Sequence, residues 1–340
     1  MLGLPPLPRT LPAALRDISS KKPEIRAEAI RDLVRHSADA RSEAVRAVEG
    51  ALRDTDPRVR GAAATALSDM EAKESLPALL VAVEDDDAYV RQMAISALGE
   101  IGDVRAGERL RRALTDTRPE VRFQAVIAFP RVTARKTDAA EAVLAAMDDD
   151  DALVAHIAVR MAEELCEDNA ARTELLSKAE SLLKHDSDRV KLAAAVLLAH
   201  NGNDAGRSLF VKAATRAIKD VDGEDEAAAI ELCGELQLTE AKPGLEKRAF
   251  SGLLGLGRDP FRWHARVALA RMGHERAAQE ITTDLASWDR DKRSLAVAAA
   301  GRARMVAARD TIRAMRGDPA RADPDAVTEA LLALDKKPAK

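Results

Sequence analysis

One phrase recurs along the chain and constrains its fold more than any other feature of the sequence. It starts with an aspartate, passes through a turn to Val-Arg and ends on a small residue, most clearly in Asp54–Ala63, Asp85–Ala94 and Asp116–Ala125. The final small residue returns 31–36 residues apart at Ala29, Ala63, Ala94, Ala125, Ala158, Ala194, Ala229, Ala265, Ala296 and Ala330. A period of this length is typical of tandem helical repeats.

Each part of the phrase has a physical role in starting and burying a helix. Aspartate caps the free N–H groups of a helix, and proline, as in Asp56-Pro57, is tolerated in the first turn. The valine (Val59, Val90) and the small residue four positions later fall on one helical face. A second apolar helix, such as residues 76–83, precedes each phrase. The repeat unit is therefore predicted to be helix, short acidic turn, helix.

Composition indicates that these helices pack in thin layers. The chain of 340 residues is 46% hydrophobic but only 2% aromatic, and alanine and leucine fill thin layers better than a thick core. We expect an all-α fold, a right-handed α-solenoid of about nine to ten helix pairs. We expect a flexible tail at residues 1–9, a single solenoid over 10–335 with an irregularity near 150–260, and a loose basic tail at 336–340.

The repeated pattern, carried best by Asp85–Gly102, resembles the HEAT-repeat family, especially the phycobilisome-lyase-type HEAT-like repeats. The resemblance extends over nearly the whole chain. It implies second helices that line a concave surface, and aspartate–arginine bonds that join consecutive repeats as a ladder. The candidate ladder residues are Asp54, Arg60, Asp85, Arg91, Asp116 and Arg122. The basic member elsewhere is Arg26, Lys191, Arg262 or Arg293, whereas Ala155 and Glu226 break the pattern.

Catalytic chemistry known on this fold is not visible in the sequence. The repeated His-Glu pairs of a di-iron hydroxylase are missing, because only His274-Glu275 is present. His156 and His264 have no acidic partner at triad spacing, and Cys166 and Cys233 read as small core residues. We therefore expect no catalytic residue, no metal and no cofactor.

Net charge and targeting signals limit the class of partner and the cellular compartment that we expect. Net charge is −4, and the +7 of residues 242–340 (20 basic, 13 acidic) is opposed by −11 in the rest (33 basic, 44 acidic), which disfavours nucleic acid. No apolar run reaches the ~20 residues of a membrane span, and the N-terminus lacks a signal-peptide pattern. We expect a monomeric cytoplasmic protein.

The expected function is that of a non-enzymatic scaffold or adaptor that binds another protein in the concave groove. The alternatives are a HEAT-like enzyme of the bilin lyase or DNA glycosylase type, or a nucleic-acid binder using the basic C-terminal third. Two and six residues after the valine position, side chains point away from the core. These candidate partner-binding residues are Phe123, Ile127, His156, Arg160, Leu192, Val196, Trp263 and Val267. The opposing interpretation is that they pack against the adjacent repeat as core.

Overall fold

The computed structural model describes residues 8–166, 169–251 and 258–335, and all regular elements within these ranges are helical. The expected tails at residues 1–7 and 336–340 lie outside the described residues. The chain divides into two compact units, Met1–Lys178 (unit 1) and Ala179–Lys340 (unit 2). Each unit is a series of packed helix pairs, which confirms the all-α solenoid class. The boundary between the units falls inside α11 (Asn169–Leu182).

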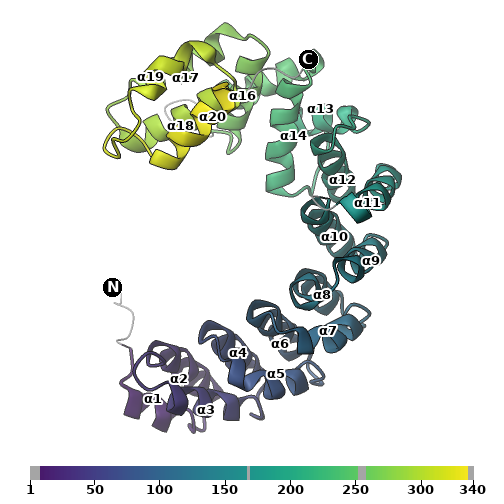
Figure 1. The fold of residues 1–340 in the computed structure, drawn as a ribbon, viewed down its shortest axis with the longest axis vertical. Helices are drawn as coiled ribbons and strands as arrows, with labels where there is room; N and C mark the ends of the chain where they lie inside the picture. Colours follow the sequence, from purple (N-terminus) through teal and green to yellow (C-terminus); the bar gives the residue numbers. More distant parts are fainter. Residues whose placement is uncertain (1–7, 167–168, 252–257, 336–340) are drawn as a thin grey trace. The chain divides into compact units, whose positions relative to one another are not determined.

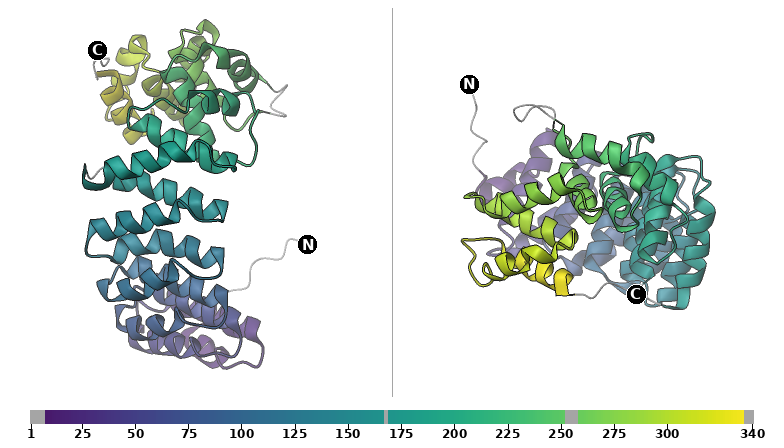
Figure 2. Two further views of the ribbon diagram at one scale, coloured as in Figure 1. Left: turned by 90° about the vertical axis from the view of Figure 1, so that its right-hand side faces the viewer. Right: turned by 90° about the horizontal axis from the view of Figure 1, so that it is seen from above.

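Unit 1 consists of two layers of helices. Its elements are α1 (Leu11–Asp17), α2 (Pro23–Arg35), α3 (Arg41–Ala51), α4 (Pro57–Asp69), η1 (Lys73–Ser75), α5 (Leu76–Ala82), α6 (Ala88–Ile101), η2 (Val104–Ala106), α7 (Gly107–Ala113), α8 (Pro119–Val132), α9 (Lys136–Ala146) and α10 (Ala152–Leu165). The second helices of the repeats, α2, α4, α6, α8 and α10, pack side by side in one layer, and α3, α5, α7 and α9 form the other (Figure 1). Figure 2 shows these helices as a stack of nearly parallel rods.

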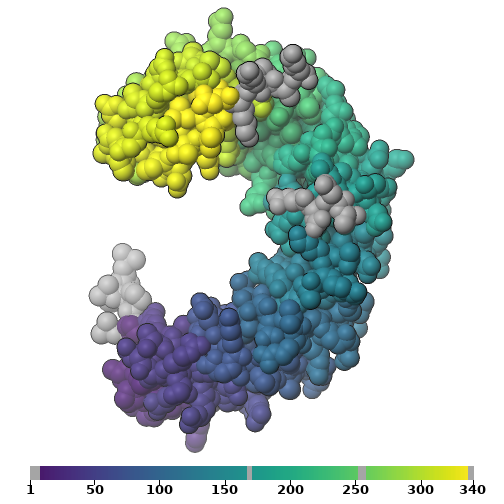
Figure 3. All heavy atoms as spheres, in the orientation of Figure 1, coloured from purple at the N-terminus to yellow at the C-terminus, as the bar shows by residue number. Residues whose placement is uncertain are grey.

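The core of unit 1 lies between the two layers, where the sequence pattern places it. The valine positions Val59, Val90 and Val121 and the small residues Ala63 and Ala94 are fully buried. Side chains fill the space between neighbouring helices (Figure 3). The second helices thus bury one face and leave the opposite face uncovered by the first-helix layer.

The helix ends follow the local sequence. Asp56 and Asp87 accept backbone N–H bonds at the starts of α4 and α6, as caps do. Gly102, in the left-handed region at φ 69°, ends α6, and Glu71 takes the equivalent place after α4 at φ 50°. Glycine adopts this conformation without strain, so α6 carries the better terminator.

Second helices approach one another closely at a glycine near their C-terminal ends. A Cβ atom on Gly99 would lie 2.7 Å from the Ala128 Cβ, and one on Gly234 would lie 2.5 Å from the Ala268 Cα. Neither separation is sterically possible without backbone movement. The repeated phrase marks only the small residue five positions earlier, so this second contact was not predicted from the sequence.

Unit 2 repeats the same arrangement with more irregular turns. Its elements are α12 (Asp188–His200), α13 (Arg207–Ala214), α14 (Gly223–Glu235), η3 (Thr239–Ala241), α15 (Lys242–Phe250), α16 (Arg262–Arg271), α17 (Glu275–Leu285), α18 (Arg290–Arg302), η4 (Val306–Ala308), α19 (Arg309–Arg313) and α20 (Pro324–Asp335). The helices α12, α14, α16, α18 and α20 pack in sequence as the second-helix layer.

Arg9 is not part of a loose tail, although residues 1–9 were expected to be one. Its guanidinium donates hydrogen bonds to Asp17 (2.9 Å), Asp32 (2.9 Å) and Glu28 (3.0 Å). These three carboxylates hold the pKa of Arg9 above its usual range. The arginine therefore fastens α1 to α2, a long-range contact that a pattern based on repeat spacing cannot reveal.

Candidate functional site

A ladder of arginine–aspartate pairs joins the repeats of unit 1 along the turns that precede the second helices. Each arginine binds the aspartate of the following repeat with two parallel hydrogen bonds. The shorter N···O distances are 2.5 Å for Arg26–Asp54, 2.8 Å for Arg60–Asp85, 2.8 Å for Arg91–Asp116 and 2.7 Å for Arg122–Asp149. Such bidentate pairs fix both distance and orientation.

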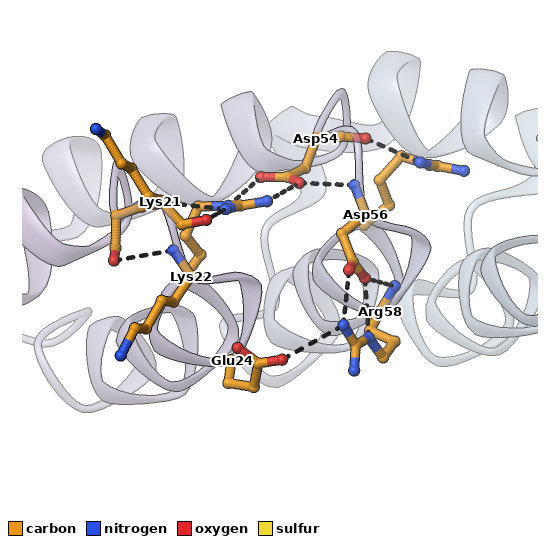
Figure 4. A network of polar contacts seen from close by, with 9 residues as sticks. Lys21, Lys22, Glu24, Asp54, Asp56 and Arg58 are labelled. Atoms are coloured by element: carbon orange, nitrogen blue, oxygen red, sulfur yellow. Dashed lines mark hydrogen bonds and ion pairs between the residues drawn. The ribbon is translucent and has the colours of Figure 1, made fainter.

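The same arginines also hold their own turn. The remaining guanidinium nitrogen of Arg60 donates to the Asp54 carbonyl at 2.8 Å, and that of Arg91 to the Asp85 carbonyl at 3.0 Å. The aspartate, in turn, accepts the backbone N–H two residues later, as Asp54 does from Asp56 at 2.8 Å (Figure 4). Within one repeat, Asp54 and Arg60 are therefore joined through the backbone, and their side chains pair with neighbouring repeats.

These bonds shift the titration of the aspartates. Burial raises the pKa of Asp85, but the hydrogen bonds from Arg60 and the Asp87 N–H outweigh burial and bring that pKa below its usual value. The pKa values of Asp54, Asp116 and Asp149 are lowered by the same balance. The ladder is therefore ionised at neutral pH.

The regular ladder ends at Asp149 because the next repeat has Ala155 where the arginine stands. We call each of these ion pairs between repeats a rung of the ladder. In unit 2 one rung has its charges exchanged, because an acidic residue stands at the arginine position. Glu226 takes the arginine position of α14 and accepts a 2.6 Å bond from Arg248 of α15. Arg248, only 3% exposed, also donates to the Ala213 and Ala214 carbonyls at 2.7 and 2.8 Å. Asp259, buried nearby, lies 3.6 Å from Arg248 and pairs with Arg216.

The predicted partner-binding stripe does not exist as a continuous exposed row. Leu192, Val196 and Val267 are at most 3% exposed and belong to the hydrophobic cores of unit 2. They are core residues and not the groove-exposed residues that the helical angle predicted. His156 is also buried. The reason is that neighbouring second helices lie close enough to cover these positions. Four of the eight candidates keep partial exposure: Phe123, Ile127, Arg160 and Trp263.

A different set of apolar side chains reaches the surface in unit 1. Tyr89 is 45% exposed and Leu153 is 52% exposed, and each lies one residue before the valine position of its helix. At 100° per residue this position falls on the same face as Phe123 and Ile127. Met93, partly buried, lies on that face of α6 as well. We call these five residues, on α6, α8 and α10, the α6–α10 face.

The corresponding face of α2 and α4 has another character. It carries Glu24, Arg58 and Arg31, and Arg58 lies 2.8 Å from Asp56 and 3.5 Å from Glu24 (Figure 4). Gly61 of α4 leaves room for the ring of Tyr89, which a Cβ at this position would strike. The apolar character is therefore confined to the last three second helices of unit 1.

Unit 2 has a cavity of about 520 Å³ on its second-helix layer, lined by α12, α14, α16 and α18. At its wall, Glu231 is hydrogen-bonded to His264 at 2.7 Å and to Arg302 at 2.9 Å. Burial raises the pKa of Glu231, but the hydrogen bond with His264 and the charge of Arg302 outweigh burial and bring that pKa below its usual value. His264 thus has an acidic partner, contrary to the sequence analysis, since the partner comes from the preceding repeat.

Comparison with known proteins identifies the repeats of the N-terminal part of the chain. A family model described as HEAT repeats matches residues 9–87 and 76–163. This part of the chain consists of HEAT repeats. No curated protein matches the sequence.

Solved structures share the fold at low sequence identity. The HEAT-containing chain is similar to a homology model of the full-length AP-3 complex (TM-score 0.54, 16% identity, 86% of this chain and 56% of that one). It is also similar to importin beta (TM-score 0.50, 12% identity, 95% and 51%). The complex of CpcE and CpcF of phycocyanin lyase from Nostoc sp. PCC7120 aligns with TM-score 0.44 and 21% identity over 72% of this chain and 96% of that one.

The two cysteines and His274 have surroundings typical of structural residues. Cys166 and Cys233 are free and buried. Burial raises the pKa of Cys233 to about 12, so its thiol is protonated at neutral pH. His274 caps α17 and lies 3.3 Å from Glu246. None of the helices formed by the described residues has the length and apolarity needed to span a bilayer.

Proposed function

We propose that this HEAT-repeat protein is a non-enzymatic scaffold that binds a protein partner through the α6–α10 face. The observation that carries the proposal is the exposure of Tyr89 and Leu153, 45% and 52%, on the face that also presents Phe123 and Ile127. Large apolar side chains grouped on one exposed face mark interaction sites in soluble proteins. Aromatic anchors contribute a large share of binding energy at protein interfaces.

The character of neighbouring side chains supports a protein rather than a nucleic acid on this face. Between the apolar residues lie Gln92, Ser96 and Gln124, which are polar and uncharged. The two charged side chains on this face, Glu120 and Arg160, have opposite signs and are paired locally, with Arg118 at 2.8 Å and Glu163 at 3.6 Å. Depletion of charge at the centre of an interface is typical of protein partners. A phosphate backbone would instead require lysine or arginine there.

The cavity of unit 2 supports a structural role for His264 better than a catalytic one. The described residues that line it include no serine, threonine, cysteine or lysine to act as a nucleophile. Glu231 instead links α14 to α16 and α18 through His264 and Arg302. We further propose a monomer in the cytoplasm, a location that suits two free thiols.

The test compares two pairs of exposed apolar residues in the same unit. Tyr89→Ser with Leu153→Ser removes the anchors of the α6–α10 face, whereas Val81→Ser with Val104→Ser, at 71% and 63% exposure, alters the other layer. Tagged proteins are incubated with extract of the native cell, and recovered proteins are quantified by mass spectrometry. We expect the first pair to lose partners that wild type and the second pair retain, at similar melting temperature. Equal recovery by all three proteins would contradict the proposal.

A further inference from the structure

Arg262 occupies the ladder position of its repeat, but no carboxylate of the described residues binds it. Each ladder arginine of unit 1 lies three residues before the small residue of its repeat, as Arg262 lies before Ala265. The aspartate that receives it lies nine residues before the next small residue, as Asp85 precedes Ala94. In the repeat after Arg262 this place belongs to Ser287. A hydroxyl cannot give a guanidinium the bidentate acceptor that a carboxylate gives.

The local charge around Arg262 is unbalanced. In the described part of the chain, neither Arg262 nor the exposed Arg258 forms an ion pair or a side-chain hydrogen bond. Burial, followed by the like charges of Arg258 and Arg266, lowers the pKa of Arg262. Asp284 acts on Arg262 in the opposite direction, but it already binds Lys292 at 2.6 Å. A further negative charge would therefore relieve repulsion at this point.

Arg266 does not supply the missing acceptor, although it shares the same stretch of α16. It pairs with Glu280 at 2.6 Å, and its Nε atom is buried without a hydrogen-bond acceptor. Trp288, which follows Ser287 directly in the sequence, is 93% exposed, so an aromatic side chain stands one residue from the position that a ladder aspartate would occupy. Unlike Trp288, Trp263 is partly buried, with the guanidinium groups of Arg262 and Arg266 5.8 and 5.2 Å from its ring.

We propose that Arg262, together with Arg258, binds a side-chain carboxylate from an acidic segment of a protein partner, in the place that an aspartate fills elsewhere in the ladder. The ladder itself identifies the ligand, because four equivalent arginines bind carboxylates. Trp288 adds an apolar contact for the same segment. This site is on unit 2 and does not depend on the α6–α10 face.

The binding test uses a fluorescein-labelled hexaglutamate peptide and the full chain, with fluorescence anisotropy at low salt and at about 150 mM salt. Loss of a charge-assisted bidentate bond should weaken binding about tenfold or more in Arg262→Gln. Arg262→Lys, which keeps the charge but not the fork, should fall between wild type and Arg262→Gln. Arg316→Gln, an exposed position of unit 2 without an ion pair in the described chain, is the matched control and should bind as wild type.

A second variant fills the site from within the protein. Ser287→Asp restores the ladder aspartate, so it should raise the melting temperature by about 2–4 °C and abolish peptide binding. Both results together support the proposal. Unchanged peptide affinity in Arg262→Gln, or peptide binding retained by Ser287→Asp despite the higher melting temperature, would overturn it. Tighter, Arg262-dependent binding of a single-stranded oligothymidylate of matched charge would also overturn it, in favour of nucleic acid.

Discussion

Unit 1 and unit 2 both stack helix pairs, but the polar contacts that join consecutive repeats differ between them. In unit 1, four arginines in succession bind the next repeat's aspartate, all with the same polarity. In unit 2, Glu226 and Arg248 reverse that polarity, and Arg293 donates to the backbone carbonyls of Ala320 and Arg321 at 3.0 and 2.6 Å. The helix period survives all three arrangements, so the period is set by the apolar faces and not by the identity of the rung.

The comparison of the two units also shows which part of the contact between repeats varies. Where an arginine stands at the ladder position, its acceptor is a carboxylate in unit 1 and a pair of backbone carbonyls at Arg293. The described residues give the Arg262 guanidinium neither kind of acceptor, and other positive charges lie near it. An arginine at the ladder position that is paired stabilises the contact between repeats, whereas one that the described residues leave unpaired, such as Arg262, is available to bind a ligand.

The largest effect is expected on breaking the reversed rung. Arg248→Ala removes a guanidinium that is 3% exposed and leaves Glu226 and two carbonyls without their donor, while Asp259 keeps its pair with Arg216. Removing one partner of a buried ion pair costs about 3–5 kcal/mol. Urea denaturation followed by circular dichroism measures the change in unfolding free energy. A change below about 1 kcal/mol, the range of exposed pairs, would show that the network contributes little.

A smaller effect is expected from a single rung in unit 1. Arg91→Ala breaks the pair with Asp116, whose side chains are 15% and 14% exposed, and we expect a cost of about 2–3 kcal/mol. Arg105→Ala, which breaks a pair in which the arginine is 67% exposed, is the control and should cost under about 1 kcal/mol. Because repeat stability depends on nearest neighbours, hydrogen exchange should rise first in residues 76–132. Equal costs for the two variants would mean that the ladder is no stronger than a surface pair.

The fold was predictable from the sequence because one short phrase repeats at a nearly constant spacing. The buried faces follow from that phrase, as Val90 and Ala94 show, and so does the placement of aspartates at helix starts. Lateral contacts between helices could not be derived in the same way. Leu192 and Val267 are buried by neighbouring repeats, and a helical wheel of one helix contains no information on how closely the next one lies.

The candidate sites were predictable only in part, for the same reason. Asp149 completes the fourth rung but is not among the six ladder residues predicted from the sequence. Its signal was available in its distance from Ala158, which matches that of Asp116 from Ala125. Tyr89 was overlooked because the expected stripe left out the position before the valine, where an apolar residue has no role in the core.

Acidification should weaken unit 1 through its ladder, with a smaller effect than either substitution. The folded-state pKa of Asp116 is lowered, so its contribution to stability is complete above the unfolded-state pKa of about 3.9 and is lost as pH falls through the folded value. The difference in unfolding free energy between wild type and Asp116→Asn should therefore be constant near neutral pH and shrink below about pH 4. Asp86→Asn, an exposed position one residue from a ladder aspartate, is the control and should track wild type throughout. Urea denaturation at a series of pH values measures both differences, and an Asp116→Asn difference that persists at the lowest pH would mean that packing, not the ionised pair, stabilises this rung.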